Sequence, residues 1–212
     1  PGETVAIMGP TGSGKTTLIN LISRMYDVDS GKVMVDGENV RMLKLSQLRR
    51  NIGVASQDVL LFSDTIEGNI AFGNSSMSDD DVHKYASLAA ADDFIRKTSD
   101  SYNTIIGERG VGLSGGQKQR ISLARALAVK PSVLILDDTT SAVDMETEKY
   151  IQNSLRNLDF KCTKIIIAQR ISSTKDADKI IVLRNGTIED IGTHDELISR
   201  KGYYREVYDL QT

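Results

Sequence analysis

The stretch PGETVAIMGPTGSGKTTLINLI (residues 1–22) predicts a strand, a glycine-rich turn and a helix in direct succession, with the strand at Thr4–Met8. Within it, GPTGSGKT (Gly9–Thr16) matches the phosphate-loop pattern G-x-x-x-x-G-K-[ST]. In that pattern, backbone N–H groups and the positive end of a helix dipole surround an anion. We therefore predict a nucleoside triphosphate site, of a kind that kinases, GTPases and ATPases share.

Individual positions of this loop have distinct expected roles. Gly12 and Gly14 allow the backbone to curl so that its N–H groups point inward. The ammonium group of Lys15 can reach the terminal phosphates, and the hydroxyl of Thr16 can ligate Mg²⁺.

Further short strands are expected downstream, at KVMVDG, NIGVAS, VLILDD, KIIIAQ and KIIVLRNG. Helical patterns lie between several of them, and this alternation predicts an α/β fold with a mainly parallel sheet. The middle of the chain, from about Asp64 to Val129, is mostly helical in pattern. Ser78 followed by Asp81 is a helix-start signature there. We therefore expect a helical lobe inserted into the α/β core.

The run VLILDD (Val133–Asp138) ends in two adjacent aspartates. Two carboxylates at the tip of a buried strand are costly unless a positive group is held beside them. In phosphate-loop proteins, an acid at the tip of a neighbouring strand holds the Mg²⁺ of the bound nucleotide. Asp137 fits that role.

The segment LSGGQKQRISLARAL begins at Leu113 and predicts a helix that starts at Ser114. Ser114 and Gln117 have capping-box spacing, and the glycines between them leave the amino end of the helix sterically open. Such a helix end is a second anion site. One phosphate loop does not need a second anion site on its own chain. A sandwich of two chains does, with each nucleotide held between the loop of one chain and the SGGQ of the other.

With these motifs the chain resembles, over essentially its whole length, the nucleotide-binding domain of ATP-binding cassette (ABC) transporters. The phosphate loop, the signature Leu113–Gln117 and the strand Val133–Asp138 stand in the family's order and spacing. Gln57 matches the family's glutamine that contacts Mg²⁺ and faces the membrane domain. SAVD (Ser141–Asp144) matches the loop that crosses the dimer interface, and IGERG (Ile106–Gly110) resembles the loop that touches the coupling helices of exporters.

The resemblance implies a P-loop NTPase core at about residues 1–63 and 130–212, a helical subdomain at about 64–129, and an amino terminus without the family's first β-strands. It implies ATP and Mg²⁺ as ligands, with Thr16, Gln57 and Asp137 at the metal. The residues implied to contact nucleotide are Gly9, Gly12, Ser13, Gly14, Lys15, Thr16, Thr17 and Gln57 in the chain's own site, and Ser114, Gly115, Gly116 and Gln117 in the partner's site.

Two departures from the family pattern concern catalysis, in which Gln57 is also expected to take part. Active members carry a glutamate after the Mg²⁺ aspartate and a histidine at the end of the switch strand; this chain has Asp138 and Gln169. A shorter carboxylate and an amide that cannot carry a proton predict a site that binds ATP better than it hydrolyses it. The pattern resembles the degenerate subunit of a heterodimeric exporter.

The 26 basic and 29 acidic residues give a net charge of -3, which gives no support to nucleic acid as a partner. The expected partners are a second nucleotide-binding domain and transmembrane domains upstream in the same polypeptide, with this domain at the cytoplasmic face of a membrane. Two alternatives remain: a regulatory nucleotide-binding module without hydrolysis, and a soluble ABC ATPase of DNA repair or translation. The second should show paired cassettes or a long coiled-coil insertion, which this sequence lacks.

Overall fold

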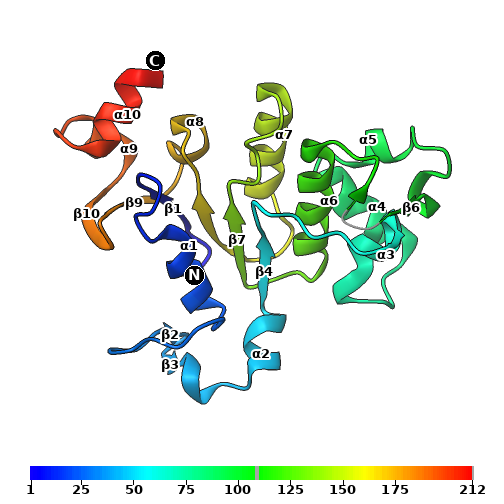
Figure 1. The fold of residues 1–212 in the computed structure, drawn as a ribbon, viewed down its shortest axis with the longest axis horizontal. Helices are drawn as coiled ribbons and strands as arrows, with labels where there is room; N and C mark the ends of the chain where they lie inside the picture. The colour runs from blue at the N-terminus through cyan, green and yellow to red at the C-terminus, as the bar shows by residue number, and fades with distance from the viewer. Residues whose placement is uncertain (108–109, 212) are drawn as a thin grey trace. The chain divides into compact units, whose positions relative to one another are not determined.

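The computed structural model describes residues 1–107 and 110–211, so Glu108 and Arg109 of the predicted coupling loop lie outside the described residues. The described chain forms two compact units (Figure 1). The first comprises residues 1–52 and 163–212, and the second comprises residues 53–162. The division into a core and a helical subdomain that the sequence suggests stays a prediction.

The first unit is built on parallel strands. Its elements are β1 (Thr4–Met8), α1 (Lys15–Ile22), β2 (Met34–Val35), β3 (Glu38–Asn39), the 3₁₀ helix η1 (Val40–Met42), α2 (Leu45–Arg50), β8 (Thr163–Ile167), α8 (Ile171–Thr174), β9 (Lys179–Arg184), β10 (Thr187–Gly192), α9 (His194–Ile198) and α10 (Tyr203–Gln211). The strand order is β10-β9-β1-β8, and β1 runs parallel to both of its neighbours. This confirms the predicted α/β class with a mainly parallel sheet.

Two tight turns explain where the strands differ from the prediction. KVMVDG forms only the two-residue β2, which pairs with β3 across Asp36 and Gly37, both at positive φ. Asn185 and Gly186 likewise have positive φ and reverse the chain from β9 into the antiparallel β10. Positive φ at both central residues is the signature of a type I′ hairpin turn, which suits the twist of paired strands.

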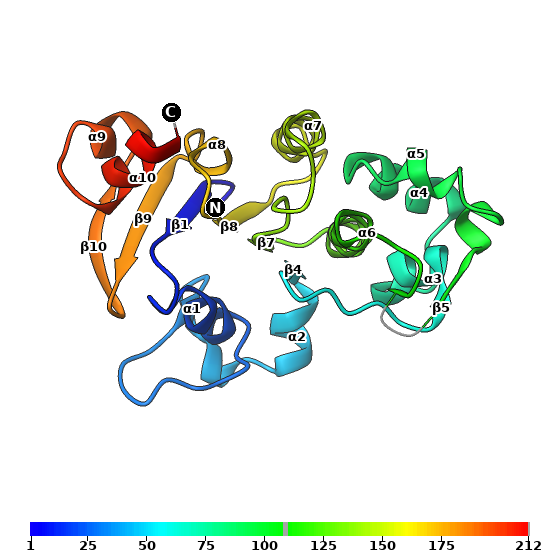
Figure 2. The ribbon, with the colours of Figure 1, turned by 45° about the horizontal axis from the view of Figure 1, so that its top comes forward.

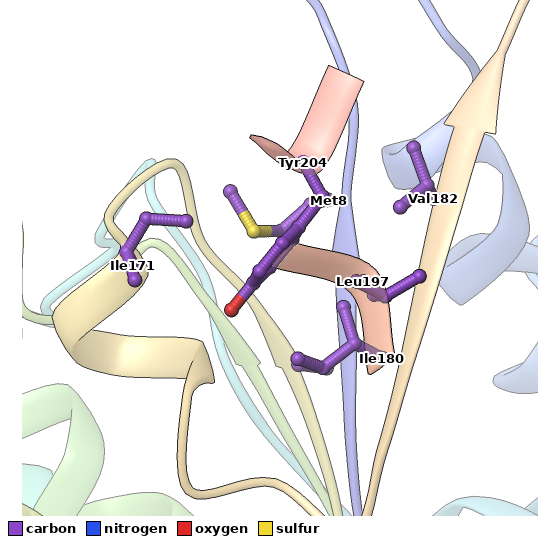
Figure 3. Packing of buried hydrophobic residues seen from close by; sticks show 7 residues of the cluster. Met8, Ile171, Ile180, Val182, Leu197 and Tyr204 are labelled. Atoms are coloured by element: carbon purple, nitrogen blue, oxygen red, sulfur yellow. The ribbon is translucent and has the colours of Figure 1, made fainter. Parts of the chain in front are cut away.

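The carboxyl-terminal helices pack on the first unit through one apolar cluster (Figure 3). Tyr204 of α10 is buried with Leu197 of α9 among side chains of β1, β9 and α8. Met8, the last residue of β1, belongs to the same cluster, so the root of the phosphate loop lies in this core.

The second unit is mainly helical. Its elements are β4 (Ile52–Ala55, beginning one residue before the unit), β5 (Asp64–Thr65), α3 (Ile66–Ile70), the 3₁₀ helix η2 (Ala71–Gly73), α4 (Asp79–Leu88), α5 (Asp92–Ile95), the 3₁₀ helix η3 (Ser101–Asn103), β6 (Ile105–Ile106), α6 (Gly115–Ala128), β7 (Val133–Asp137) and α7 (Met145–Arg156). Figure 2 shows α6 end-on beside α3 and α4, both of which it contacts.

Local signals account for most helix starts in this unit. Ser78 caps α4 by accepting from the Asp81 N–H, as predicted, and Asp144 caps α7 by accepting from the Thr147 N–H. The middle of the chain, predicted to be mostly helical, also contains an antiparallel pair of short strands, β5 with β6. Across the described residues, no helix is both long enough and apolar enough to pass through a bilayer.

Candidate nucleotide-binding site

The phosphate loop starts at Gly9, where β1 ends against β9. A Cβ on Gly9 would lie 2.1 Å from the backbone oxygen of Leu183 and 2.7 Å from Ser13 Oγ, and the φ of Gly9 is +153°. Only glycine fits there. Gly12 and Gly14 also have positive φ, the backbone conformation that the predicted curl of the loop needs.

Lys15 places a buried cation in the centre of this loop. Its Nζ donates to the carbonyl oxygens of Gly9 at 2.7 Å and Pro10 at 2.9 Å, and to Ser13 Oγ at 3.4 Å. Ser13 is buried as well. These bonds hold the Lys15 ammonium group inside the phosphate loop, where a cation suits an anionic ligand.

The helix that follows the loop presents its amino end in the same place. Gly14 is the N-cap of α1, and within the described chain no side chain caps that end. The first N–H groups of an uncapped helix lack intrahelical acceptors and carry the positive end of the dipole. The side chains of Thr16 and Thr17 in this first turn are exposed. The loop and helix therefore fit a phosphate group, with the Thr16 hydroxyl available to a metal ion.

The parallel register brings the switch residue to the same edge of the sheet. Ile7 of β1 pairs with Ile167 of β8, and Gly9 and Gln169 each lie two residues beyond this pair on adjacent parallel strands. The Gln169 side chain is exposed there. The first unit therefore brings the phosphate loop and Gln169 together.

The second unit holds the acidic residues. Asp137 ends β7 and is buried, whereas Asp138 is half-buried with a left-handed φ of +50°. Asp is one of the residue types that are enriched in that conformation. β4 is the neighbour of β7, and Gln57 follows its end with an exposed side chain.

Gln119 of α6 links the acidic turn to the loop that follows it. Its Nε2 donates to the carbonyl oxygen of Asp138 at 3.4 Å and to Ser141 Oγ at 3.3 Å, and its Oε1 accepts from the Ala142 N–H at 3.3 Å. Ser141 Oγ donates to the same Asp138 carbonyl at 2.9 Å. The sequence analysis missed Gln119, although a polar residue amid the apolar face of α6 was a signal.

The predicted capping box at the start of α6 is confirmed. Ser114 N–H donates to Gln117 Oε1 at 2.9 Å, and Gln117 N–H donates to Ser114 Oγ at 3.3 Å. Gly115 is exposed, but Gly116 is buried, and a Cβ on Gly116 would lie 2.6 Å from the Ala142 carbonyl oxygen. The prediction that both glycines leave the helix end open is therefore wrong for Gly116, which lets the backbone of the next loop approach.

Arg125 connects the other end of α6 to the segment after Gln57, and the sequence analysis missed it. Its guanidinium donates to the carbonyl oxygens of Asn69 and Leu60 at 2.8 and 2.7 Å and to Asn69 Oδ1 at 2.7 Å. It also lies over the stacked rings of Phe62 and Phe72. Burial lowers the pKa of Arg125 to about 10, so the group is a cation at neutral pH.

Comparison with known proteins identifies the family. Residues 1–141 match the model of the ABC transporter family. Proteins of Staphylococcus aureus strains NCTC 8325 and Mu50, provisionally named multidrug export ATP-binding/permease proteins, are 49% identical over 210 residues, which is 99% of this chain and 36% of each relative.

A solved structure of a bacterial Atm1-family ABC exporter with ATP bound is 40% identical, with a TM-score of 0.96. The match covers all of this chain and 37% of that chain, so this chain spans about a third of the proteins it matches. This chain has a phosphate loop after β1, a capped helix that begins at the signature residues, and aspartates at the end of β7, in a fold that it shares with these proteins. The chain is therefore a nucleotide-binding domain of the ABC transporter family.

Proposed function

We propose that this chain is the ATP-binding domain of one half of an ABC exporter, and that ATP binding closes it onto a second nucleotide-binding domain. The observation that carries the proposal is the buried Lys15 ammonium beside the uncapped end of α1, because this pair suits a polyphosphate. The names of the relatives join ATP binding to a permease, which supports transmembrane domains as partners and the cytoplasmic face of a membrane as the location.

Within this proposal, the loop from Gly9 to Thr17 binds the phosphates through its N–H groups and Lys15. Thr16, Gln57 and Asp137 would hold Mg²⁺, directly or through water; the hydroxyl, amide and carboxylate oxygens of these side chains suit that ion. When bound, Mg²⁺ neutralises charge on the phosphates. Asp138 and Gln169 would then orient the attacking water and contact the γ-phosphate.

We propose that hydrolysis at this chain's own site is slow. The Asp138 carboxylate is one methylene shorter than the glutamate that active family members use, and a misplacement of about 1 Å can cost about a hundredfold in rate. Gln169 offers an amide in place of a titratable imidazole. Both residues serve one site, so the partner in this proposal is a different half-transporter whose own site is active.

The signature residues would complete the ATP site of that partner. Ser114 and Gly115 are exposed at the amino end of α6, which has 14 residues and a full capping box. Gln119 hydrogen-bonds this helix to the Asp138 turn and the Ser141 loop. Nucleotide binding at the amino end of α6 can therefore change the position of the Asp138 turn, and the reverse.

An apolar surface of the second unit supports transmembrane domains as the other partner. Phe62 lies a few residues after Gln57, and its ring stacks on that of Phe72 with the ring centroids 4.2 Å apart. The Phe72 residue is 61% exposed. Leu60 stands close before Phe62 in the chain, Ile105 of β6 pairs with Thr65 of β5, and both of these apolar side chains are exposed. Exposed aromatic and aliphatic side chains gathered in this way mark an interaction site. We assign it to the cytoplasmic ends of the transmembrane helices.

Replacement of Lys15 tests nucleotide binding in the full transporter with its partner. Lys15→Ala removes the only charged side chain of the loop, and we expect the affinity of this site for Mg·ATP to fall about thirtyfold, the equivalent of about 2 kcal/mol for charged hydrogen bonds. Photo-crosslinking with an azido-ATP, quantified on each subunit, measures it. Lys44→Ala, on an exposed lysine outside the loop, is the control. Unchanged labelling of Lys15→Ala would sink the proposal.

The degenerate site is tested by restoring both residues. Asp138→Glu extends the carboxylate and Gln169→His supplies a titratable donor. The effects of residues that act as a unit are not additive. We therefore expect the hydrolysis rate to rise less than about tenfold with either change alone and about a hundredfold with both. Single-turnover hydrolysis is measured in a heterodimer whose partner carries LSGGQ and whose other site is silenced.

A double variant no faster than the parent, with ATP binding intact, would show that these two residues do not limit the site. The same assay, applied to the native pair, distinguishes this proposal from the main alternative. A regulatory module predicts no hydrolysis in either composite site of the native pair, whereas the proposal predicts hydrolysis in the partner's site.

A further inference from the structure

The backbone around the switch residue is held from the other end of the chain. Gln211, the last residue of α10, donates from Nε2 to the Gln169 carbonyl oxygen at 2.9 Å. Its Oε1 accepts from the Ile171 N–H at 2.8 Å. A single side-chain amide therefore bonds the backbone on both sides of Arg170.

The second of these bonds supplies what α8 lacks locally. Ile171 is the first residue of α8, so its N–H has no intrahelical acceptor. Arg170 stands at the N-cap, and an arginine side chain has no acceptor to offer. Among the described residues, Gln211 performs the task that Ser, Thr or Asp performs at an ordinary N-cap, from 40 residues away.

The helix that carries Gln211 is itself firmly placed. Tyr204 of α10 is 2% exposed, and its hydroxyl is 2.8 Å from His194 Nδ1. In Figure 3, Tyr204 lies close to Met8 and in the cluster that Ile171 joins from α8. Met8 directly precedes Gly9, so α10 packs against the root of the phosphate loop and the start of α8 together.

We propose that Gln211 is a positioning residue that fixes where the Gln169 side chain stands relative to the phosphate loop. The inference rests on the proposed role of Gln169 at the γ-phosphate. With both bonds in place, the peptide planes on either side of Arg170 have fixed directions. Without them, the exposed Gln169 backbone keeps its link to the end of β8 and the packing of Ile171, but it loses both bonds that set the directions of these peptide planes. Because ADP lacks the γ-phosphate, the loss should affect ATP alone.

The test uses the full transporter with its partner and compares Gln211→Ala with Leu210→Ala. Leu210 is the neighbouring residue on the same helix and is 87% exposed, so its replacement controls for changes to α10. For Gln211→Ala we expect hydrogen exchange of the Ile171 amide, measured without nucleotide, to quicken about fivefold. We expect affinity for a non-hydrolysable ATP analogue to fall about fivefold, with ADP affinity unchanged. Leu210→Ala should change neither quantity.

The variant Gln211→Glu separates the effects of the two hydrogen bonds. It keeps an acceptor for the Ile171 N–H and loses the donor to the Gln169 carbonyl, so it should keep amide protection at Ile171 and still weaken binding of the ATP analogue. Unchanged exchange in Gln211→Ala, or equal weakening of ATP analogue and ADP, would overturn the positioning role. A parent protein that binds neither nucleotide would instead refute the proposed function, and the exchange result would still show whether Gln211 holds the segment.

Discussion

Replacement of Arg125 by alanine is expected to lower the free energy of unfolding of the domain by about 4 kcal/mol. It leaves the partly buried carbonyl and amide oxygens of Asn69 without their charged donor, and it removes the cation that lies over two aromatic rings. The three hydrogen bonds of the guanidinium reach Leu60 and Asn69, which lie 65 and 56 residues away along the chain. Denaturant unfolding of the domain, followed by circular dichroism, measures the loss.

Arg96→Ala is the matched control. Arg96 also pairs with an aromatic ring and hydrogen-bonds Asp92 at 2.8 Å, but its side chain is 54% exposed. Exposed ion pairs contribute little, so the expected cost is below about 1 kcal/mol. Arg125→Lys keeps the charge but not the planar guanidinium group, so its loss of stability should lie between those of Arg125→Ala and Arg96→Ala. Equal losses of stability for Arg125→Ala and Arg96→Ala would contradict the role assigned to the partly buried Arg125 guanidinium.

Replacement of Gly9 by alanine is expected to destabilise the domain by about 3 kcal/mol and to weaken ATP binding about a hundredfold, since the added carbon must displace either the loop or β9. The contact at 2.1 Å is with a backbone oxygen, which cannot move without the strand that carries it. Thermal unfolding and titration with an ATP analogue measure the two effects.

Gly12→Ala separates steric contact from backbone strain. Gly12 has a φ of +79°, but no described atom lies within 4 Å of its added Cβ. Only the left-handed backbone conformation resists that change, at a cost of about 1 to 2 kcal/mol. If Gly12→Ala proved as harmful as Gly9→Ala, the contact with Leu183 would not be the cause.

The sequence by itself determined the features that depend on short spacing. The phosphate loop between β1 and α1, the strand β7 with its terminal aspartates, and the capped start of α6 all stand where the residues predict them. Each is set by groups within about four residues of one another, whose geometry the local backbone conformation fixes. The Asn185–Gly186 turn was equally readable, and the hairpin that it forms was missed only because the pair was taken as part of a strand.

Only the tertiary structure decided which distant groups meet. Three contacts join residues that lie 19 to 42 positions apart in the chain. They are the approach of Gly116 to the Ala142 backbone, the hydrogen bonds of Gln119 to the Asp138 turn, and the hydrogen bonds of Gln211 to the backbone around Arg170. No periodicity encodes such pairs, because they follow from how whole helices and strands pack, and a buried polar group bonds to whatever acceptor or donor that packing brings within reach.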